Sequence, residues 1–220
     1  MGQRGSSWLR KTLGLQHKVK RGFDVAISAS ALAALWPLLA GIGIAVRLDS
    51  SGPALFVQER AGKDGQPFTI LKFRTMAKGS EKGDVVVQQN DARITRLGSI
   101  LRATSLDELP QLLNILKGDM SVVGPRPTLV YQVEQYDDFQ RRRLEMLPGV
   151  TGWTQVNGRN SLPWPRRIEL DVWYVDNWSL LLDLKILLRT LPVVLGAEGI
   201  YGAREGFEMF EQNASGQQLH

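Results

Sequence analysis

The sequence predicts an α+β protein, mostly helical, that is attached to a membrane. Three observations lead to this prediction. Residues 25–46 carry no charged side chain, and residues 54–75 contain two strand-like runs around a glycine-containing loop. Much of the remaining chain has the spacing of apolar residues that is typical of helices. With 220 residues, the chain is long enough for one domain of ordinary size.

The uncharged segment 25–46 can be interpreted in three ways. At about 1.5 Å per residue it is just long enough to span a bilayer as a helix, and the basic flank 18–21 would keep its start in the cytoplasm. A signal peptide is the second interpretation, with a weak cleavage site near Ala45. A re-entrant hairpin is the third, because Pro37 lies in the middle and favours a kink.

The next part of the chain predicts a small β-hairpin. The strand-like runs are residues 54–58 and 67–75, and the loop between them contains Gly62-Lys-Asp-Gly65. Period-two alternation puts Lys72 and Arg74 on one face of the second strand. This face is either a basic binding surface or simply a solvated strand face.

Helical patterns follow over residues 94–103 and 106–116. The second begins with Ser105 and has Glu108 three residues later, which is the signature of a capping box. Acidic residues in a first turn also complement the helix dipole. On spacing alone, the pair Asp107-Glu108 is therefore either a structural cap or a pair of functional carboxylates.

A rigid turn at Gly124-Pro-Arg-Pro127 holds Arg126 in one place. The planar guanidinium of arginine donates two parallel hydrogen bonds and so suits a phosphate group. A surface turn rich in proline is the alternative interpretation.

The rest of the chain predicts helices, loops and a tail. Residues 130–146 are charged and helical in pattern, and Ser179 can cap a very apolar helix that still carries Asp183, Lys185 and Arg189. Such a helix lies either at a membrane interface or in a core. Two further segments are predicted to be a mobile loop and a polar tail, namely residues 78–91 and 204–220.

Composition limits the chemistry. Cysteine is absent and the two histidines, His17 and His220, are both near the termini. Thiolate nucleophiles, zinc–thiolate sites, histidine triads and multi-histidine metal sites are thus not expected. The net charge of +5 favours anionic partners, such as phosphate-bearing substrates or acidic lipids. Nucleic acid is not expected, because basic and aromatic residues do not interleave as in single-strand binders.

Taken together, the motifs resemble the bacterial sugar transferases known as monotopic phosphoglycosyl transferases, in their short, catalytic-core form. The resemblance covers about residues 18–200, and the motifs are specific in combination rather than singly. The matching pieces are Lys20-Arg21 with the Pro37-broken segment, Lys72-Phe-Arg-Thr-Met76, Ser105-Leu-Asp107-Glu108-Leu, Lys117-Gly-Asp-Met-Ser121, Gly124-Pro-Arg-Pro127, Pro148-Gly-Val-Thr-Gly-Trp153, Gln155-Val-Asn-Gly-Arg-Asn160, Glu169-Leu-Asp171-Val and Leu182-Asp183-Leu-Lys185.

This resemblance implies an architecture. It favours the re-entrant interpretation, with a helix-break-helix that dips into one leaflet and amphipathic helices that lie in the membrane interface. The location implied is the bacterial inner (cytoplasmic) membrane, with the catalytic domain on the cytoplasmic face. The expected regions are an N-terminal extension at 1–17, the anchor at 18–47, the catalytic domain at 48–203 and the tail at 204–220.

The resemblance also implies a reaction. The enzyme would transfer a phosphosugar from a UDP-sugar to undecaprenyl (polyprenyl) phosphate and release UMP, as the first membrane step of glycoconjugate or polysaccharide biosynthesis. Asp107 would be the nucleophile that forms an aspartyl phosphosugar, and Glu108 would help to hold Mg²⁺. The predicted substrate-binding residues are Lys72, Arg126, Arg159 and Asp171.

Two alternatives remain at this stage. A metal-dependent lipid-diphosphate hydrolase would use similar acids but would release its product into water. A catalytically silent membrane scaffold would need none of the acid chemistry. The sequence does not name the sugar, the glycan pathway or the oligomeric state.

Overall fold

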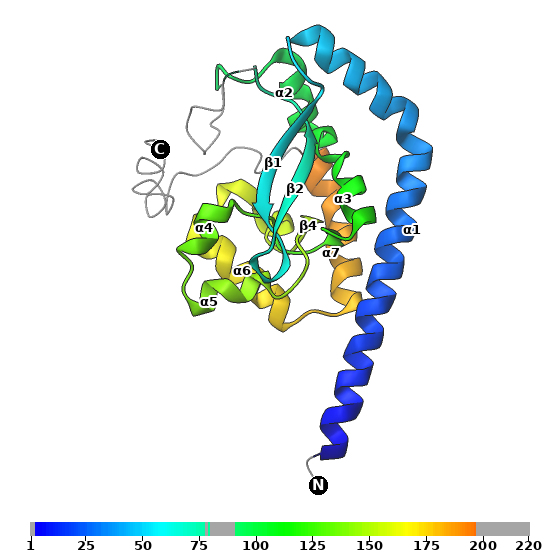
Figure 1. Cartoon of the computed structure of the whole chain (residues 1–220), viewed down its shortest axis with the longest axis vertical. Coiled ribbons are helices and arrows are strands. Elements are labelled where there is room, and N and C mark those ends of the chain that lie inside the picture. The colour runs from blue at the N-terminus through cyan, green and yellow to red at the C-terminus, as the bar shows by residue number, and fades with distance from the viewer. Residues whose placement is uncertain (1–2, 78, 80–90, 197–220) are drawn as a thin grey trace.

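The computed structural model describes residues 3–77, 79 and 91–196, and it confirms the α+β class. Helices make up most of the domain, and two small sheets lie between them (Figure 1). The predicted mobile loop at 78–91 lies almost entirely outside the described residues. The predicted tail at 204–220 lies outside them completely.

The N-terminal segment is one long helix, α1 (Gln3–Asp49), that continues through Pro37. The sequence predicts a break between two helices at this proline, whereas the structure has a single helix that bends in its second half (Figure 1). A proline ring removes one helical hydrogen bond and pushes against the preceding turn, so it bends a helix without having to end it. Among the described residues, Gly14–Asp49 is the only helix long and apolar enough to cross a membrane, by length and composition.

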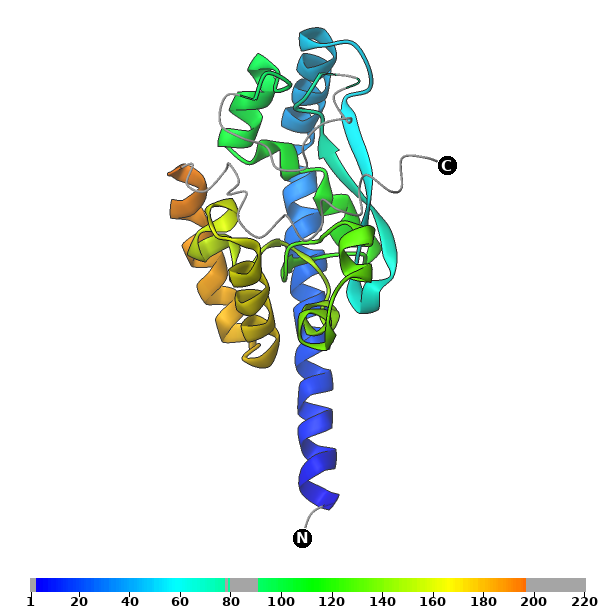
Figure 2. The same ribbon diagram turned by 90° about the vertical axis from the view of Figure 1, so that its left-hand side faces the viewer.

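Both ends of the uncharged segment are fixed to the same globular domain. At its start, the carboxylate of Asp24 accepts hydrogen bonds from the Ser121 hydroxyl at 3.0 Å and from the Val122 amide at 2.9 Å. At its end, Arg74 donates to the carbonyl of Ser50 at 2.7 Å. Figure 2 shows α1 running along the domain between these two attachments.

A buried ion pair joins α1 to the C-terminal helices. The ammonium group of Lys20 lies 2.6 Å from Asp183, and both residues are buried. The other oxygen of Asp183 accepts a hydrogen bond from the hydroxyl of Tyr174 at 2.7 Å. The motif residue Asp183 therefore holds α1, α6 (Trp164–Asp176) and α7 (Leu180–Leu195) together.

The predicted hairpin is confirmed. Strands β1 (Leu55–Ala61) and β2 (Pro67–Phe73) pair antiparallel, and a 3₁₀ turn, η1 (Lys63–Gly65), lies in the loop between them. Phe56 pairs with Lys72, so these two side chains point to the same side of the sheet. This register fixes which face of the hairpin carries the lysine.

A second sheet was not predicted. Strands β3 (Ser121–Val123) and β4 (Gly149–Thr151) pair in parallel. Two glycines make the close approach possible, because a Cβ atom added to Gly149 would lie 2.1 Å from the backbone nitrogen of Gly124. The small sheet places the Pro125-Arg-Pro127 turn directly after β3.

The predicted helices are present but shorter than the patterns suggest. The pattern at 106–116 divides into a 3₁₀ turn and a helix, and the pattern at 130–146 divides into two short helices and a 3₁₀ turn. In chain order these elements are α2 (Arg96–Ala103), η2 (Leu106–Glu108), α3 (Gln111–Lys117), α4 (Val130–Glu134), α5 (Asp138–Arg141), η3 (Arg142–Leu144), η4 (Gln155–Asn157) and η5 (Arg159–Ser161).

Helix α7 is present where predicted, and apolar residues line both its buried and its exposed side. Ser179 caps it by accepting a hydrogen bond from the Leu182 amide at 3.1 Å. Leu182 and Ile186 are buried against β3 and α6, while the opposite side exposes leucines spaced three and four residues apart. These exposed residues are Leu181, Leu184, Leu188 and Leu191.

Candidate active site

The acidic pair lies in η2, before the helix rather than in its first turn. Ser105 adopts a left-handed conformation (φ 56°), its side chain makes no capping hydrogen bond, and α3 begins only at Gln111. The capping-box prediction is therefore wrong. The motif does not cap a helix because the Glu108 side chain points away from the Ser105 backbone and toward two cationic side chains. Asp107 and Glu108 are therefore available for chemistry.

Glu108 is the centre of a charged cluster. One of its oxygens, Oε1, accepts hydrogen bonds from the Lys72 ammonium at 2.9 Å and from the Arg126 guanidinium at 2.8 Å. The side chain is buried. Burial alone would raise the pKa of Glu108, but Arg126 and Lys72 more than reverse this and hold it well below its ordinary value. Glu108 is thus a permanent anion at physiological pH.

Asp107 has the opposite electrostatic character. Burial and then the neighbouring charge of Glu108 raise the pKa of Asp107 from 3.8 to about 6, against the pull of Lys72 and Arg102. The sequence-based expectation that Asp107 lies in the first turn of an α-helix and complements its dipole is corrected, because α3 begins only at Gln111. Asp107 is still mostly ionised at neutral pH, and its higher basicity favours nucleophilic attack.

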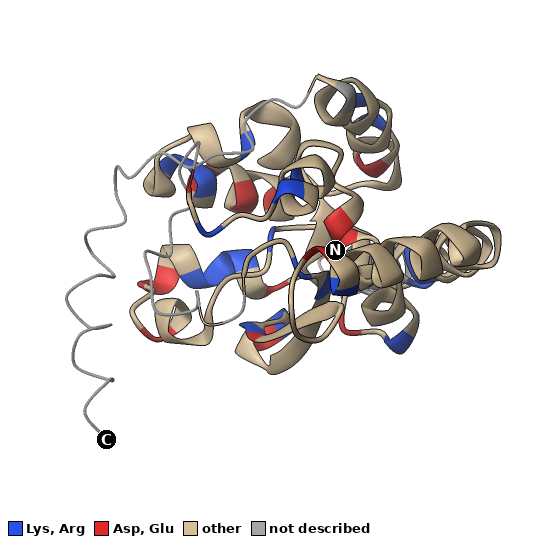
Figure 3. Cartoon of the chain, turned by 90° about the horizontal axis from the view of Figure 1, so that it is seen from above, with Lys and Arg blue, Asp and Glu red and all other residues tan. Residues whose placement is uncertain are grey.

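The structure brings three of the predicted substrate-binding residues, all of them cationic, together around this pair. Burial lowers the pKa of Lys72, and the neighbouring Glu108 opposes this. The ion pair with Glu108 therefore helps to keep the ammonium group charged. The Glu108 charge raises the pKa of Arg126. Arg159 reaches the same region, where its guanidinium donates to the Ser105 hydroxyl at 3.2 Å. Figure 3 shows basic and acidic segments interspersed across the domain.

Asp171 lies in a different environment from the other predicted residues. It is buried, and its two oxygens accept hydrogen bonds from the Thr154 hydroxyl at 2.6 Å and from the guanidinium of Arg143. Arg143 in turn donates to the main-chain carbonyl of Arg126 at 3.0 Å. Asp171 thus reaches the acidic pair through Arg143 and the Arg126 turn, and its predicted part in substrate binding stays a prediction.

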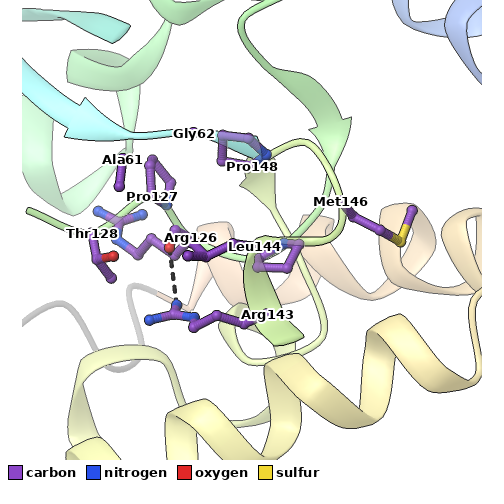
Figure 4. Close-up of a pocket in the computed structure, with 10 residues that line it drawn as sticks. Ala61, Gly62, Arg126, Pro127, Thr128, Arg143, Leu144, Met146 and Pro148 are labelled. Atoms are coloured by element: carbon purple, nitrogen blue, oxygen red, sulfur yellow. Dashed lines mark hydrogen bonds between the residues drawn. The ribbon is translucent and has the colours of Figure 1, made fainter. Parts of the chain in front are cut away.

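Arg143 was missed in the sequence because it lies among three consecutive arginines with no motif of its own. In the structure it is buried, donates to the Tyr136 hydroxyl at 2.7 Å and lies over the Trp164 ring at 5.4 Å. Figure 4 shows it beneath the Arg126 turn, beside a small pocket. The pocket is lined by Ala61, Gly62, Pro125, Arg126, Pro127, Thr128, Arg143, Leu144, Met146 and Pro148.

The donor set for a metal consists of two carboxylates. Within the described ranges, no cluster of three or more His, Cys, Asp or Glu side chains could hold an ion by itself. Because Lys72 and Arg126 both donate to Oε1 of Glu108, the other oxygen, Oε2, is the one suited to a metal. Mg²⁺ commonly binds one or two carboxylates and completes its shell with substrate phosphates and water. Glu108, the predicted metal ligand, fits that pattern as a single carboxylate ligand.

An acidic pair among cations, in a chain with a helix of membrane length, is the arrangement expected of an enzyme that acts on a phosphate-bearing substrate at a membrane. A sequence model of the family described as "Bacterial sugar transferase" matches residues 15–197. The chain belongs to this family, as its motifs predicted, and is an enzyme of the phosphoglycosyl transferase class.

Curated relatives agree with the family. The uncharacterized sugar transferase EpsL of Bacillus subtilis is 48% identical over 183 residues, covering 83% of this chain and 90% of the relative. The UDP-glucose:undecaprenyl-phosphate glucose-1-phosphate transferase of Caulobacter vibrioides is 45% identical over 195 residues, covering 83% of this chain and 72% of the relative. The undecaprenyl-phosphate galactose phosphotransferase of Salmonella typhimurium is 41% identical over 199 residues, covering 83% and 42%.

Proposed function

We propose that this enzyme transfers a phosphosugar from a UDP-sugar to undecaprenyl phosphate through a covalent intermediate on Asp107. The observation that carries the proposal is the geometry of two adjacent carboxylates, of which Glu108 accepts hydrogen bonds from both Lys72 and Arg126. This arrangement keeps Glu108 ionised, while burial and the charge of Glu108 raise the pKa of Asp107. The reaction type is supported by relatives named for transfer of glucose 1-phosphate or galactose phosphate to undecaprenyl phosphate.

In the first step, a carboxylate oxygen of Asp107 attacks the sugar-proximal phosphorus of the UDP-sugar. A new P–O bond forms to Asp107 as the bond from that phosphorus to the bridging oxygen breaks. UMP leaves with the bridging oxygen and the electron pair of the broken bond, and the phosphosugar stays on Asp107. Lys72, Arg126 and Arg159 supply the positive charge that stabilises the transferring phosphoryl group and the departing phosphate.

In the second step, a phosphate oxygen of undecaprenyl phosphate attacks the same phosphorus. The bond to Asp107 breaks, the carboxylate is regenerated, and undecaprenyl diphosphosugar leaves as the product. Both steps use one set of cationic side chains, which suits a mechanism in which the two phosphate substrates occupy the site in turn.

We include Mg²⁺ as the cofactor, which Glu108 would help to hold. When bound, it would neutralise negative charge on the diphosphate. The protein's own contribution is to keep Glu108 ionised through its two cationic partners. Asp171 pairs with Arg143, which donates to the main-chain carbonyl of Arg126, and these contacts keep the Arg126 turn in position.

We further propose that α1 enters one leaflet and returns, leaving the catalytic domain on the cytoplasmic face of the bacterial inner membrane. A helix that spans the bilayer has its two ends separated by the full thickness of the bilayer. Here Asp24 and Ser50, at the two ends of the uncharged segment, both bind the same domain, which favours entry and exit on one side. The exposed leucines of α7 suit insertion at the same interface.

The direct test is UMP release by the detergent-solubilised protein with Mg²⁺, undecaprenyl phosphate and a panel of UDP-sugars. UMP release that depends on the lipid, with one preferred sugar, is the expected result, and Asp107→Asn should abolish it. A lipid-diphosphate hydrolase would release no UMP from a UDP-sugar and would instead release phosphate from a lipid diphosphate. No release with any sugar, in a protein shown to be folded, would favour the scaffold and contradict the proposal.

A further inference from the structure

Arg60 is a second arginine beside the acidic pair that the proposed reaction does not use. It lies on β1, where one guanidinium nitrogen, Nη2, donates to the Gln58 side chain at 2.7 Å. The other, Nη1, makes only a long contact of 3.4 Å to the carbonyl of Pro127. Its Nε is buried without a hydrogen-bond partner in the part of the chain that the structure describes. The guanidinium therefore keeps hydrogen-bonding capacity that the protein does not use.

The sheet register puts Arg60 on the same face of the hairpin as Lys72. Phe56 pairs directly with Lys72, and side chains two and four residues further along a strand return to the same face. Phe56, Gln58 and Arg60 are thus on the Lys72 side. Lys72 lies near one end of this face and Arg60 near the other, and the hairpin itself arranges them in a row.

Arg126 lies close enough to interact with both ends of that row. It shares Glu108 with Lys72, and the carbonyl of Pro127, the residue that follows it, accepts the 3.4 Å contact from Arg60. Burial and then Arg126 lower the pKa of Arg60 to about 10, while Tyr131 and Glu108 oppose this. Arg60 and Arg126 therefore repel each other, and an anion bound between them would relieve this repulsion.

From this arrangement we infer that Arg60 and Arg126 form a second phosphate-binding position, at the end of the hairpin face away from Lys72. An extended row of cations suits a ligand with phosphate charge spread over several ångströms. The inference rests on the proposed function for the source of that phosphate. It is either the nucleotide diphosphate of the UDP-sugar or the phosphate head of undecaprenyl phosphate.

The test measures binding without turnover. The full chain in detergent is titrated with inorganic pyrophosphate, and binding is followed by the shift of the thermal unfolding midpoint. Arg60→Gln should weaken pyrophosphate binding by about tenfold, because one charge-assisted contact is lost. Arg60→Lys should recover part of it. The matched control is Arg166→Gln, which removes an exposed arginine paired with Glu169 and should bind like the wild type.

The ligand-free midpoint separates binding from a structural role. If Arg60 mainly faces another cation, Arg60→Gln should unfold at the same temperature as the wild type or higher. A lower midpoint with unchanged pyrophosphate affinity would mean that Arg60 only stabilises the Arg126 turn. This result would overturn the inference. Equal weakening in Arg166→Gln would overturn it too, because the effect would then be one of overall charge.

Steady-state kinetics then identify the source of the phosphate. A raised KM for the UDP-sugar in Arg60→Gln, with the KM for undecaprenyl phosphate unchanged, assigns the position to the nucleotide diphosphate. The reverse pattern assigns it to the lipid phosphate. If both KM values are unchanged, the inference fails. Since pyrophosphate binding needs no catalysis, failure of the proposed transferase activity would be seen separately.

Discussion

Replacing Asp107 by asparagine should stabilise the protein while abolishing its activity. The folded protein raises the pKa of Asp107 from 3.8 to about 6, which means that the ionised form is less favourable there than in the unfolded chain. At about 1.4 kcal/mol per pKa unit, the shift corresponds to about 3 kcal/mol at neutral pH. Asp107 keeps part of its surface in water, so screening makes this an upper limit.

The pH dependence of the free energy of unfolding follows from the direction of this pKa shift. Because the folded pKa is raised, stability is fully present below the unfolded pKa of 3.8 and is lost as the pH rises through about 6. Asparagine does not titrate, so the advantage of Asp107→Asn should be full above pH 6. It should fall to about a third of that size near pH 4.5.

Thermal unfolding in detergent at pH 7.5 and pH 4.5 measures both effects. For a domain of this size, the expected gain at pH 7.5 is up to roughly 10 °C in the unfolding midpoint. Asp64→Asn is the matched control, because Asp64 is exposed in the hairpin loop and its positive φ of 55° suits asparagine. A less stable Asp107→Asn at pH 7.5, or a gain that does not shrink at pH 4.5, would refute the reasoning.

Three further predictions address the reaction, the anchor and the small sheet. Below pH 6, kcat/KM should fall about tenfold per pH unit as Asp107 is protonated, and a flat pH profile would contradict its role as nucleophile. Asp183→Asn leaves Lys20 buried without its charge partner and should cost about 3–5 kcal/mol in the free energy of unfolding, so near-wild-type stability would be unexpected. Gly124→Ala places a Cβ 2.3 Å from a backbone oxygen and should destabilise the fold by about 1–3 kcal/mol or more, whereas Gly22→Ala, with nothing within 4 Å, should not destabilise it in the same unfolding assay.

Local patterns in the sequence predicted the elements that carry strong periodicity. The hairpin is where alternation puts it, and the apolar helix α7 begins after the Ser179 cap as predicted. The sequence also identified Lys72, Asp107, Glu108 and Arg126 as motif residues, and the structure brings these four together through contacts between the hairpin, η2 and the Arg126 turn.

The features that the sequence did not predict depend on contacts between distant residues. Strands β3 and β4 have three residues each, too few for alternation to be visible, and their pairing depends on the close approach of Gly124 and Gly149. The burial of Asp171 against Arg143 joins positions 28 residues apart, which no local pattern encodes. The spacing of Ser105 and Glu108 matches a capping box. However, Ser105 has a left-handed backbone conformation and its side chain makes no capping hydrogen bond.

The central claim is that the phosphosugar is first transferred to Asp107 and only then to the lipid. Isotope exchange tests it most directly: labelled UMP is incubated with unlabelled UDP-sugar, Mg²⁺ and enzyme in the absence of undecaprenyl phosphate. A covalent intermediate predicts that label appears in the UDP-sugar without any lipid, and that Asp107→Asn abolishes this exchange. Exchange that occurs only when undecaprenyl phosphate is present would mean direct transfer between the substrates and would contradict the account.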